Sequence, residues 1–214
     1  MRATFRAQLD TLRGRLVLMA ASATSAMRWA NQALLDGDLD AASQVLETAD
    51  QLRVARAQTE ELVHDLLVRQ QPVASDLRLA LASLYVAGDI ERMGALARHI
   101  AKIMLMRHPA PAVPPEAAVV LGRMGQLAER LAWKVTRVLE VGNPQEAVEL
   151  DRDDDEMDAL HRDLFEVLFE RWPHGTRTAV DAALLSRFYE RFADHAVNAG
   201  RRVVYLVTGQ SPNA

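Results

Sequence analysis

The 214-residue sequence contains no cysteine, which excludes disulfides, iron–sulfur clusters and cysteine-ligated zinc sites. Glycine and proline are also scarce, at 10 and 8 residues, and aromatic residues make up 5% of the chain. Half of the residues are hydrophobic, which is typical of a folded chain rather than a disordered one. The abundance of Ala, Leu, Glu and Arg favours helices, and the few aromatic residues predict an aliphatic core.

Long apolar runs and long basic runs are absent as well. The longest uncharged stretch near the N-terminus is Leu16–Met27, whereas a membrane-spanning helix takes about 20 apolar residues. We therefore expect no membrane span and no signal peptide. The formal net charge is -4 and the longest Lys/Arg run is Arg201-Arg202, which argues against a nucleic-acid partner. No Gly-rich phosphate loop and no nucleophile elbow are present, so we expect no enzyme, and the sequence shows no phosphate site of the Gly-rich loop type.

Apolar residues recur at steps of three and four, the period of one helix face. Gly, Pro and Asp-rich segments interrupt this pattern at five places, and the last residue of the sixth stretch lies close to Gly209. The sequence thus predicts six long helices, at about 5–34, 39–68, 72–106, 116–140, 144–169 and 179–207. Long helices joined by short loops pack antiparallel.

The chain divides into two similar halves. Four prolines within nine residues mark a connector at 107–115, between a first unit at 1–108 and a second at 114–209. The stretch ERMGALARHIAK (91–102) aligns with ERFADHAVNAGR (190–201), on the last helix of each half. We therefore expect an all-α fold of two pseudo-symmetric antiparallel three-helix bundles.

Paired carboxylates suggest a metal site in the second half. Glu190 and Asp194 are four residues apart, as are Asp154 and Asp158 on the preceding helix, so each pair lies on one helix face. If the two pairs face each other, they would supply hard oxygen ligands for Mg²⁺, Mn²⁺, Ca²⁺ or iron. The neighbouring His195 would contact these ligands rather than the metal. The alternatives are a solvated acidic face, or neutralisation of Glu190 by neighbouring arginines.

A second pattern points to different chemistry. Glu61-x-x-His64 and Asp158-x-x-His161 loosely match the spacing found in di-iron carboxylate bundles. Such an oxidoreductase would need these side chains to face inward around a buried metal pair. A metal-free helical adaptor is the third possibility.

Four motifs in order resemble the PhoU family of phosphate-transport regulators along nearly the whole chain. They are QQPVASDLR (70–78), DIERMG (89–94), DDEMDALH (154–161) and ERFADHAVN (190–198). The resemblance implies two three-helix bundles related by a pseudo-twofold axis in a cytoplasmic protein, often homodimeric. It implies a negative regulator of the phosphate-starvation response that connects the ATPase subunit of the phosphate-specific ABC transporter with a sensor histidine kinase.

The resemblance also implies a divalent or iron ion at an acidic E-x-x-x-D motif in each half. The second half keeps this pattern, at Glu190, Asp194, Asp154 and Asp158.

The first half departs from the acidic pattern. It keeps Glu91, but the position four residues later is Ala95, and the middle-helix equivalents are Ala49 and Arg53. Lys102 replaces a later acidic residue, and Arg53 is a candidate partner for Glu91. We therefore expect the second half to bind a metal and the first half to bind it poorly or not at all.

Overall fold

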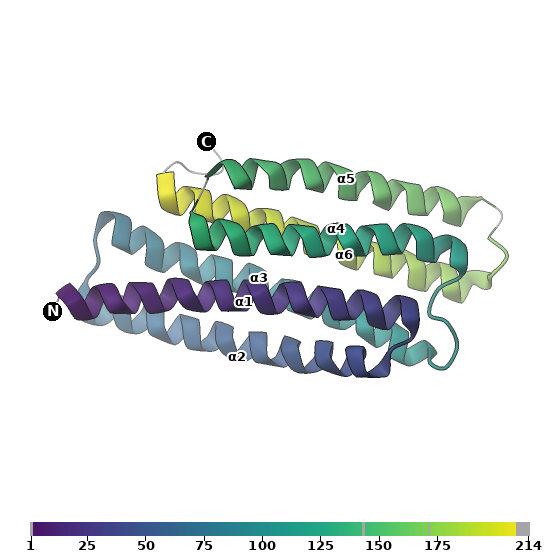
Figure 1. Cartoon of the computed structure of the whole chain (residues 1–214), viewed down its shortest axis with the longest axis horizontal. Helices are drawn as coiled ribbons and strands as arrows, with labels where there is room; N and C mark the ends of the chain where they lie inside the picture. Colours follow the sequence, from purple (N-terminus) through teal and green to yellow (C-terminus); the bar gives the residue numbers. More distant parts are fainter. Residues whose placement is uncertain (1, 143, 171, 209–214) are drawn as a thin grey trace.

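A computed structural model describes residues 2–142, 144–170 and 172–208, and these residues form six helices and no strand (Figure 1). The expected all-α fold of six long helices is confirmed. The helices are α1 (Arg2–Asp36), α2 (Leu39–Gln70), α3 (Ala74–Arg107), α4 (Pro115–Val141), α5 (Pro144–Phe169) and α6 (Gly175–Thr208).

The helix ends follow from a few local residues. Gly37 has a φ of 69°, which an L side chain rarely adopts, and it reverses the chain after α1. Asp38 then caps α2, because its carboxylate accepts a hydrogen bond from the backbone N–H of Ala41 at 2.9 Å. Gly142 ends α4 in the same left-handed conformation. The predicted cap Asn143 lies outside the described residues.

One helix starts earlier than the sequence predicts. Helix α6 begins at Gly175 rather than near Ala179. The Thr178 hydroxyl donates to the carbonyl of His174 at 2.7 Å, and Trp172 Nε1 donates to the carbonyl of Gly175 at 3.0 Å. These local hydrogen bonds hold an extra turn that hydrophobic periodicity does not reveal.

The six helices form four layers (Figure 1). Helices α1, α2 and α3 contact one another, as do α4, α5 and α6, which gives the expected pair of three-helix bundles. The bundles meet through α1 against α4 and α3 against α6, so α2 and α5 form the outer layers. The division of the chain into two units at 107–115 remains a prediction.

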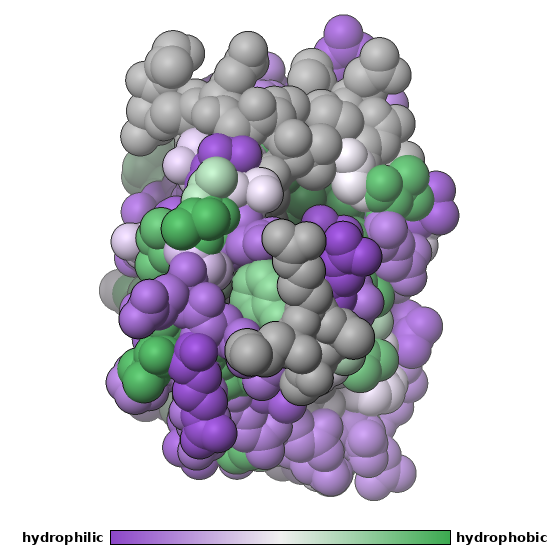
Figure 2. Space-filling model, turned by 90° about the vertical axis from the view of Figure 1, so that its left-hand side faces the viewer, coloured by the Kyte–Doolittle hydropathy of each residue, from purple (hydrophilic) through white to green (hydrophobic). Residues whose placement is uncertain are grey.

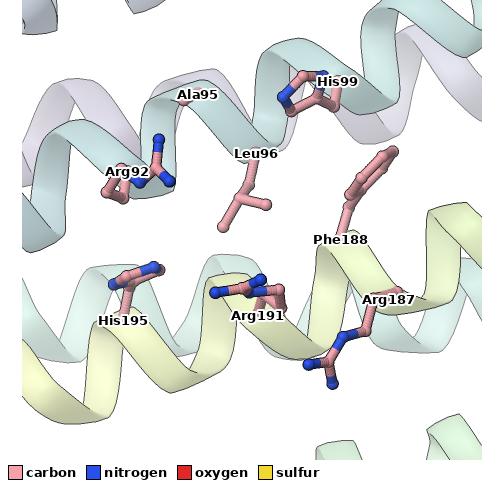
Figure 3. A pocket seen from close by; sticks show the side chains of 8 residues that line it. All are labelled: Arg92, Ala95, Leu96, His99, Arg187, Phe188, Arg191 and His195. Atoms are coloured by element: carbon pink, nitrogen blue, oxygen red, sulfur yellow. The ribbon is translucent and has the colours of Figure 1, made fainter.

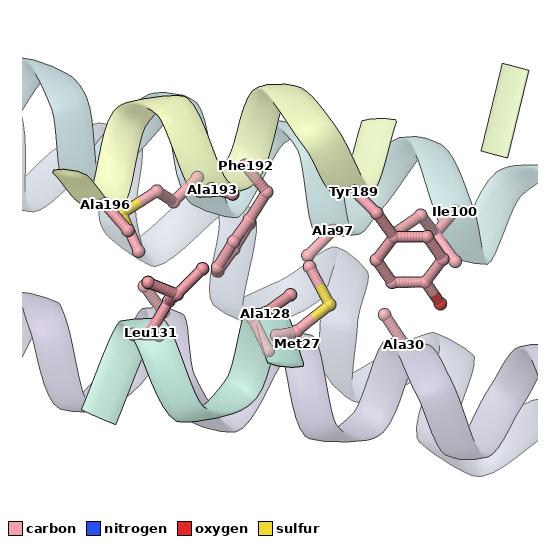
Figure 4. Packing of buried hydrophobic residues seen from close by; sticks show 14 of the residues in the cluster. Met27, Ala30, Ala97, Ile100, Ala128, Leu131, Tyr189, Phe192, Ala193 and Ala196 are labelled. Atoms are coloured by element: carbon pink, nitrogen blue, oxygen red, sulfur yellow. The ribbon is translucent and has the colours of Figure 1, made fainter. Parts of the chain in front are cut away.

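The core is continuous through both halves. Met27 on α1, Leu131 on α4, and Tyr189 and Phe192 on α6 pack together in its centre (Figure 4). Alanines such as Ala97 lie between them and let the helices approach closely. A single cluster contains buried residues from all six helices, so each half buries apolar surface against the other.

Polar contacts also cross between the halves. Arg107 near the end of α3 pairs with Asp181 near the start of α6, and His99 stacks on Phe188 with ring centroids 5.1 Å apart. Positions on α6 thus decrease as those on α3 increase, so these two helices run antiparallel.

Among the residues that the structure describes, hydrophilic side chains predominate on the surface at the end of the molecule where both termini lie. Figure 2 shows hydrophilic side chains there, with hydrophobic ones in separate small patches. Along the described parts of the chain, none of the helices has the length and apolar character required to cross a bilayer.

Candidate functional site

Helices α5 and α6 bring the four predicted carboxylates toward one another. Burial raises the pKa of Asp154, and the negative charges of Asp194 and Asp158 raise it further, to about 6. Arg201 opposes this shift. The carboxylates of α5 and α6 therefore repel one another electrostatically, as expected for pairs that face each other across a groove.

Glu190 has opposing electrostatic influences and one unsatisfied carboxylate oxygen. Burial and the charge of Asp194 raise its pKa, while Arg187 lowers it. Arg187 pairs with Glu190 Oε1, but Glu190 Oε2 is buried and has no hydrogen-bond partner in the part of the chain that the structure describes. An unsatisfied buried carboxylate oxygen is costly, and a cation beside it would relieve the cost.

The donor set suits a hard cation, but the side chains are not arranged as a finished site. Asp194 and Asp158 are exposed, whereas Asp154 and Glu190 are half-buried. Within the described residues, no three His, Asp or Glu side chains lie close enough together to hold a metal ion. A cation on this face would therefore require the side chains of Glu190, Asp194, Asp154 and Asp158 to rotate toward it. We call these four residues the acidic face.

The first half places its remaining carboxylate in an ion pair. Glu91 accepts from Arg56 on α2 at 3.3 Å, and the same arginine pairs with Glu60. The expected partner Arg53 is wrong: Arg53 is exposed, and Arg56, one turn further along α2, reaches Glu91 instead. The sequence pattern identified the correct helix for the arginine that pairs with Glu91, but it does not determine how far a flexible arginine side chain reaches.

The remaining first-half positions offer no oxygen ligands. Ala49 is buried, Ala95 is half-buried and Lys102 is exposed. Glu91 thus stands without acidic neighbours at the positions that correspond to the acidic face.

His195 does not support the acidic face, contrary to expectation. Its Nδ1 lies 3.0 Å from Asp89 on α3, so its ring is turned toward α3. The same carboxylate accepts from Arg202 Nε at 3.0 Å. Asp89 is 9% exposed, whereas its partners are partly exposed, so this network is a part-buried link between the halves.

Asp89 is a residue that the sequence reasoning missed. An available signal was its position: it lies at helical spacing between Val86 and Met93, on a face that is otherwise apolar and buried. An acidic residue on such a face requires a partner from another element.

The di-iron interpretation is wrong for this fold. Glu61 and His64 are exposed on α2 rather than turned inward. His161 lies on α5, and its Nδ1 lies 2.6 Å from the buried Ser186 hydroxyl. Among the described residues α2 and α5 share no contact, so the two motifs cannot meet around a buried metal pair.

Comparisons with known proteins agree with this architecture. The model of the PhoU domain matches residues 16–104 and 121–203. A protein of Mycobacterium tuberculosis called phosphate-specific transport system accessory protein PhoU homolog 2 is 45% identical over 213 residues, covering 99% of this chain and 100% of the relative.

Solved structures show the same fold. The crystal structure of PhoU from Pseudomonas aeruginosa matches with a TM-score of 0.89 at 25% identity, over 96% of this chain and 100% of that one. The phosphate transport system regulatory protein PhoU from Streptococcus pneumoniae matches with a TM-score of 0.85 at 22% identity, over 96% and 98% of the two chains. The two domain matches correspond to the two helical bundles seen here, and the chain belongs to the PhoU family.

Proposed function

We propose that this protein regulates phosphate transport as a negative regulator of the phosphate-starvation response. In this role it links the ATPase subunit of the phosphate-specific ABC transporter to a sensor histidine kinase and so modulates phosphate uptake. The observation that carries the proposal is the 45% identity, over 99% of the chain, to a relative named as an accessory protein of phosphate-specific transport.

The architecture is compatible with a regulator that acts by contact rather than by catalysis. Long helices in a shared core form a rigid body, and the outer helices α2 and α5 present extended surfaces to partners. We propose that the protein is not an enzyme and that it acts in the cytoplasm, as a homodimer that reaches the membrane through its partners.

Deleting the gene tests the regulatory role. In phosphate-rich medium, the deletion strain should express a phosphate-starvation reporter at a raised level, and a plasmid copy should restore repression. Deleting the sensor kinase as well should abolish the raised expression, because the kinase is downstream in this proposal. Unchanged reporter expression in the single deletion would contradict the proposal.

We further propose that the acidic face binds a divalent or iron ion in the second half only. The unsatisfied Oε2 of Glu190 and the mutual repulsion of the carboxylates favour a cation there. When bound, the ion would supply positive charge that joins α5 to α6. Asp154, Asp158, Glu190 and Asp194 would hold it.

Elemental analysis of the purified protein separates this proposal from a metal-free adaptor. Metal near one equivalent per chain, lost in Asp194→Ala, would support the acidic face as the site. A protein that binds no metal, and whose stability and partner binding are unaffected by a chelator, would instead be a metal-free helical adaptor.

A further inference from the structure

A hollow of about 240 Å³ lies between α3 and α6, where the two halves meet (Figure 3). Ala95, Leu96 and Phe188 contribute apolar lining. Its other prominent side chains are basic: Arg92, His99, Arg187, Arg191 and His195. Among the described residues, no acidic side chain lines it. This composition is unusual in a chain with a net charge of -4.

Two of the arginines have guanidinium groups available for a ligand. Arg92 on α3 and Arg191 on α6 are exposed, and within the described parts of the chain neither makes a hydrogen bond or an ion pair. Arg187 differs, because its guanidinium pairs with Glu190 and is turned away from α3 (Figure 3). His195 is likewise occupied by Asp89.

The positive charge affects the neighbouring histidine. Burial lowers the pKa of His99, and Lys102, Arg98 and Arg92 lower it further. The surroundings of His99 therefore already disfavour an additional positive charge, and a negatively charged ligand would relieve the same repulsion.

The duplicated architecture explains why both free arginines meet here. In the alignment of the two halves, Arg92 and Arg191 occupy the same position, directly after Glu91 and Glu190. Because α3 and α6 pack antiparallel, equivalent positions approach each other only near the pseudo-twofold axis, and the contacts Arg107–Asp181 and His99–Phe188 place Arg92 and Arg191 close to that axis. Neither half alone contains the hollow, so the site exists only in the assembled pair of bundles.

We propose that this hollow binds a phosphoryl oxyanion, either inorganic phosphate or the phosphate group of a small monoester. Two planar guanidinium groups, Arg92 and Arg191, can donate pairs of N–H groups to a tetrahedral oxyanion from opposite sides. The hollow is smaller than the roughly 300–1,000 Å³ of pockets for drug-sized ligands, which favours a small anion over a nucleotide. The charge and geometry of the hollow support anion binding independently of the regulatory role proposed above.

Isothermal titration calorimetry on the full chain tests the proposal. Inorganic phosphate and glycerol 3-phosphate are titrated separately at pH 7 in low salt, with acetate as a carboxylate probe. We expect one saturable site per chain for at least one phosphoryl probe, and weaker binding of acetate. Binding of inorganic phosphate would identify free phosphate as the ligand, and binding of glycerol 3-phosphate alone would identify a monoester.

Substitutions locate the site. Arg92→Ala combined with Arg191→Ala should weaken binding at least tenfold, and Arg191→Lys should weaken it less, because lysine keeps the charge but not the planar fork. Arg123→Ala, which removes an exposed arginine from α4, should leave the affinity unchanged. Circular dichroism and thermal melting of each variant show whether the fold is preserved.

Three results would overturn the inference. The first is no saturation by either phosphoryl probe up to about 10 mM, which corresponds to very weak binding. The second is equal affinity in the wild type and the double variant, or equal loss in Arg123→Ala. The third is acetate binding as tightly as phosphate, which would point to an acidic side chain of a protein partner instead. None of these results would contradict the regulatory role, which the reporter experiment tests separately.

Discussion

The hydroxyl of Tyr189 on α6 donates a hydrogen bond to Asn31 Oδ1 on α1, at 2.7 Å. The tyrosine is 1% exposed, and burial raises the pKa of its hydroxyl, which therefore remains a donor at physiological pH. This hydrogen bond joins one half of the molecule to the other inside the shared core.

Replacing Tyr189 with Phe should destabilise the fold. The substitution removes the donor and leaves Asn31 Oδ1 without this partner, which costs about 1–3 kcal/mol of unfolding free energy. Urea denaturation measures the loss. Tyr85→Phe is the matched control, because Tyr85 is 59% exposed and the ring that Arg202 covers is retained. Equal stabilities of the Tyr189→Phe variant and the wild type would show that the hydrogen bond contributes nothing net.

Gly125→Ala should be destabilising although alanine is the better helix former. A Cβ at Gly125 would overlap the Asn31 side chain, which the Tyr189 hydroxyl holds in place. Overpacking of this kind costs about 1–3 kcal/mol, more than the roughly 0.5–1 kcal/mol that alanine gains in a helix. The free energy of unfolding should therefore fall.

Gly14→Ala is the control for Gly125→Ala. A Cβ at Gly14 meets nothing within 4 Å, so only the helix-propensity gain applies and this variant should be slightly more stable than the wild type. If both alanine variants were more stable than the wild type, α1 and α4 would leave room for a methyl group at Gly125, and the prediction would be wrong.

The metal-free protein should gain stability from Asp154→Asn at neutral pH. The folded protein raises the pKa of Asp154 from 3.8 to about 6, so above pH 6 the ionised carboxylate destabilises the fold. As pH falls from 6 toward 3.8, the folded state holds a proton that the unfolded state still releases, and the penalty disappears. In the presence of a chelator, the stability advantage of the variant should therefore be largest above pH 7 and shrink by pH 4.

Asp163→Asn provides the control for this experiment, because Asp163 is an exposed carboxylate on the same helix. It should change stability little at any pH. A metal-free Asp154→Asn protein that is less stable than the wild type at pH 7.5 would contradict the repulsion among these carboxylates.

Added divalent cation should raise the melting temperature of the wild type. At a free concentration about a hundredfold above Kd, one site adds about 2.7 kcal/mol to the free energy of unfolding. Asp194→Ala should abolish the increase in melting temperature, whereas Glu91→Ala should retain it, since Glu91 is already paired with Arg56. A titration that gives two equivalent sites per chain would contradict the asymmetry between the halves.

The helices were predictable because their signals are local. Gly37 and Asp38 form a corner whatever surrounds them, and the Pro-rich segment before Pro115 cannot continue a helix. The proximity of the two carboxylate pairs was predictable for a related reason: spacing by four places two carboxylates on one side of a helix, and neighbouring helices in a bundle face each other. That these carboxylates hold a metal remains a prediction.

Contacts between the halves were not predictable in the same way. Periodicity identifies the buried face of α3 and α6 but not how the two helices are rotated and shifted against each other. The pairing of Asp89 with His195 joins residues 106 positions apart, and the placement of Arg92 and Arg191 around one hollow depends on the same packing. Arg53 was wrongly predicted as the partner of Glu91 for a simpler reason, since side-chain reach decides between Arg53 and Arg56, one turn apart.

Arg187 stands between two regions of opposite charge. Its backbone end lines the basic hollow, while its guanidinium neutralises Glu190 on the acidic face. A cation bound to the Glu190 carboxylate would replace Arg187 as its partner. The freed guanidinium could then turn toward the hollow and raise the affinity of the hollow for an anion. Thermodynamic linkage requires the converse, that the anion favours the cation by the same factor. One shared arginine would thereby make the two ions cooperative ligands of a single protein.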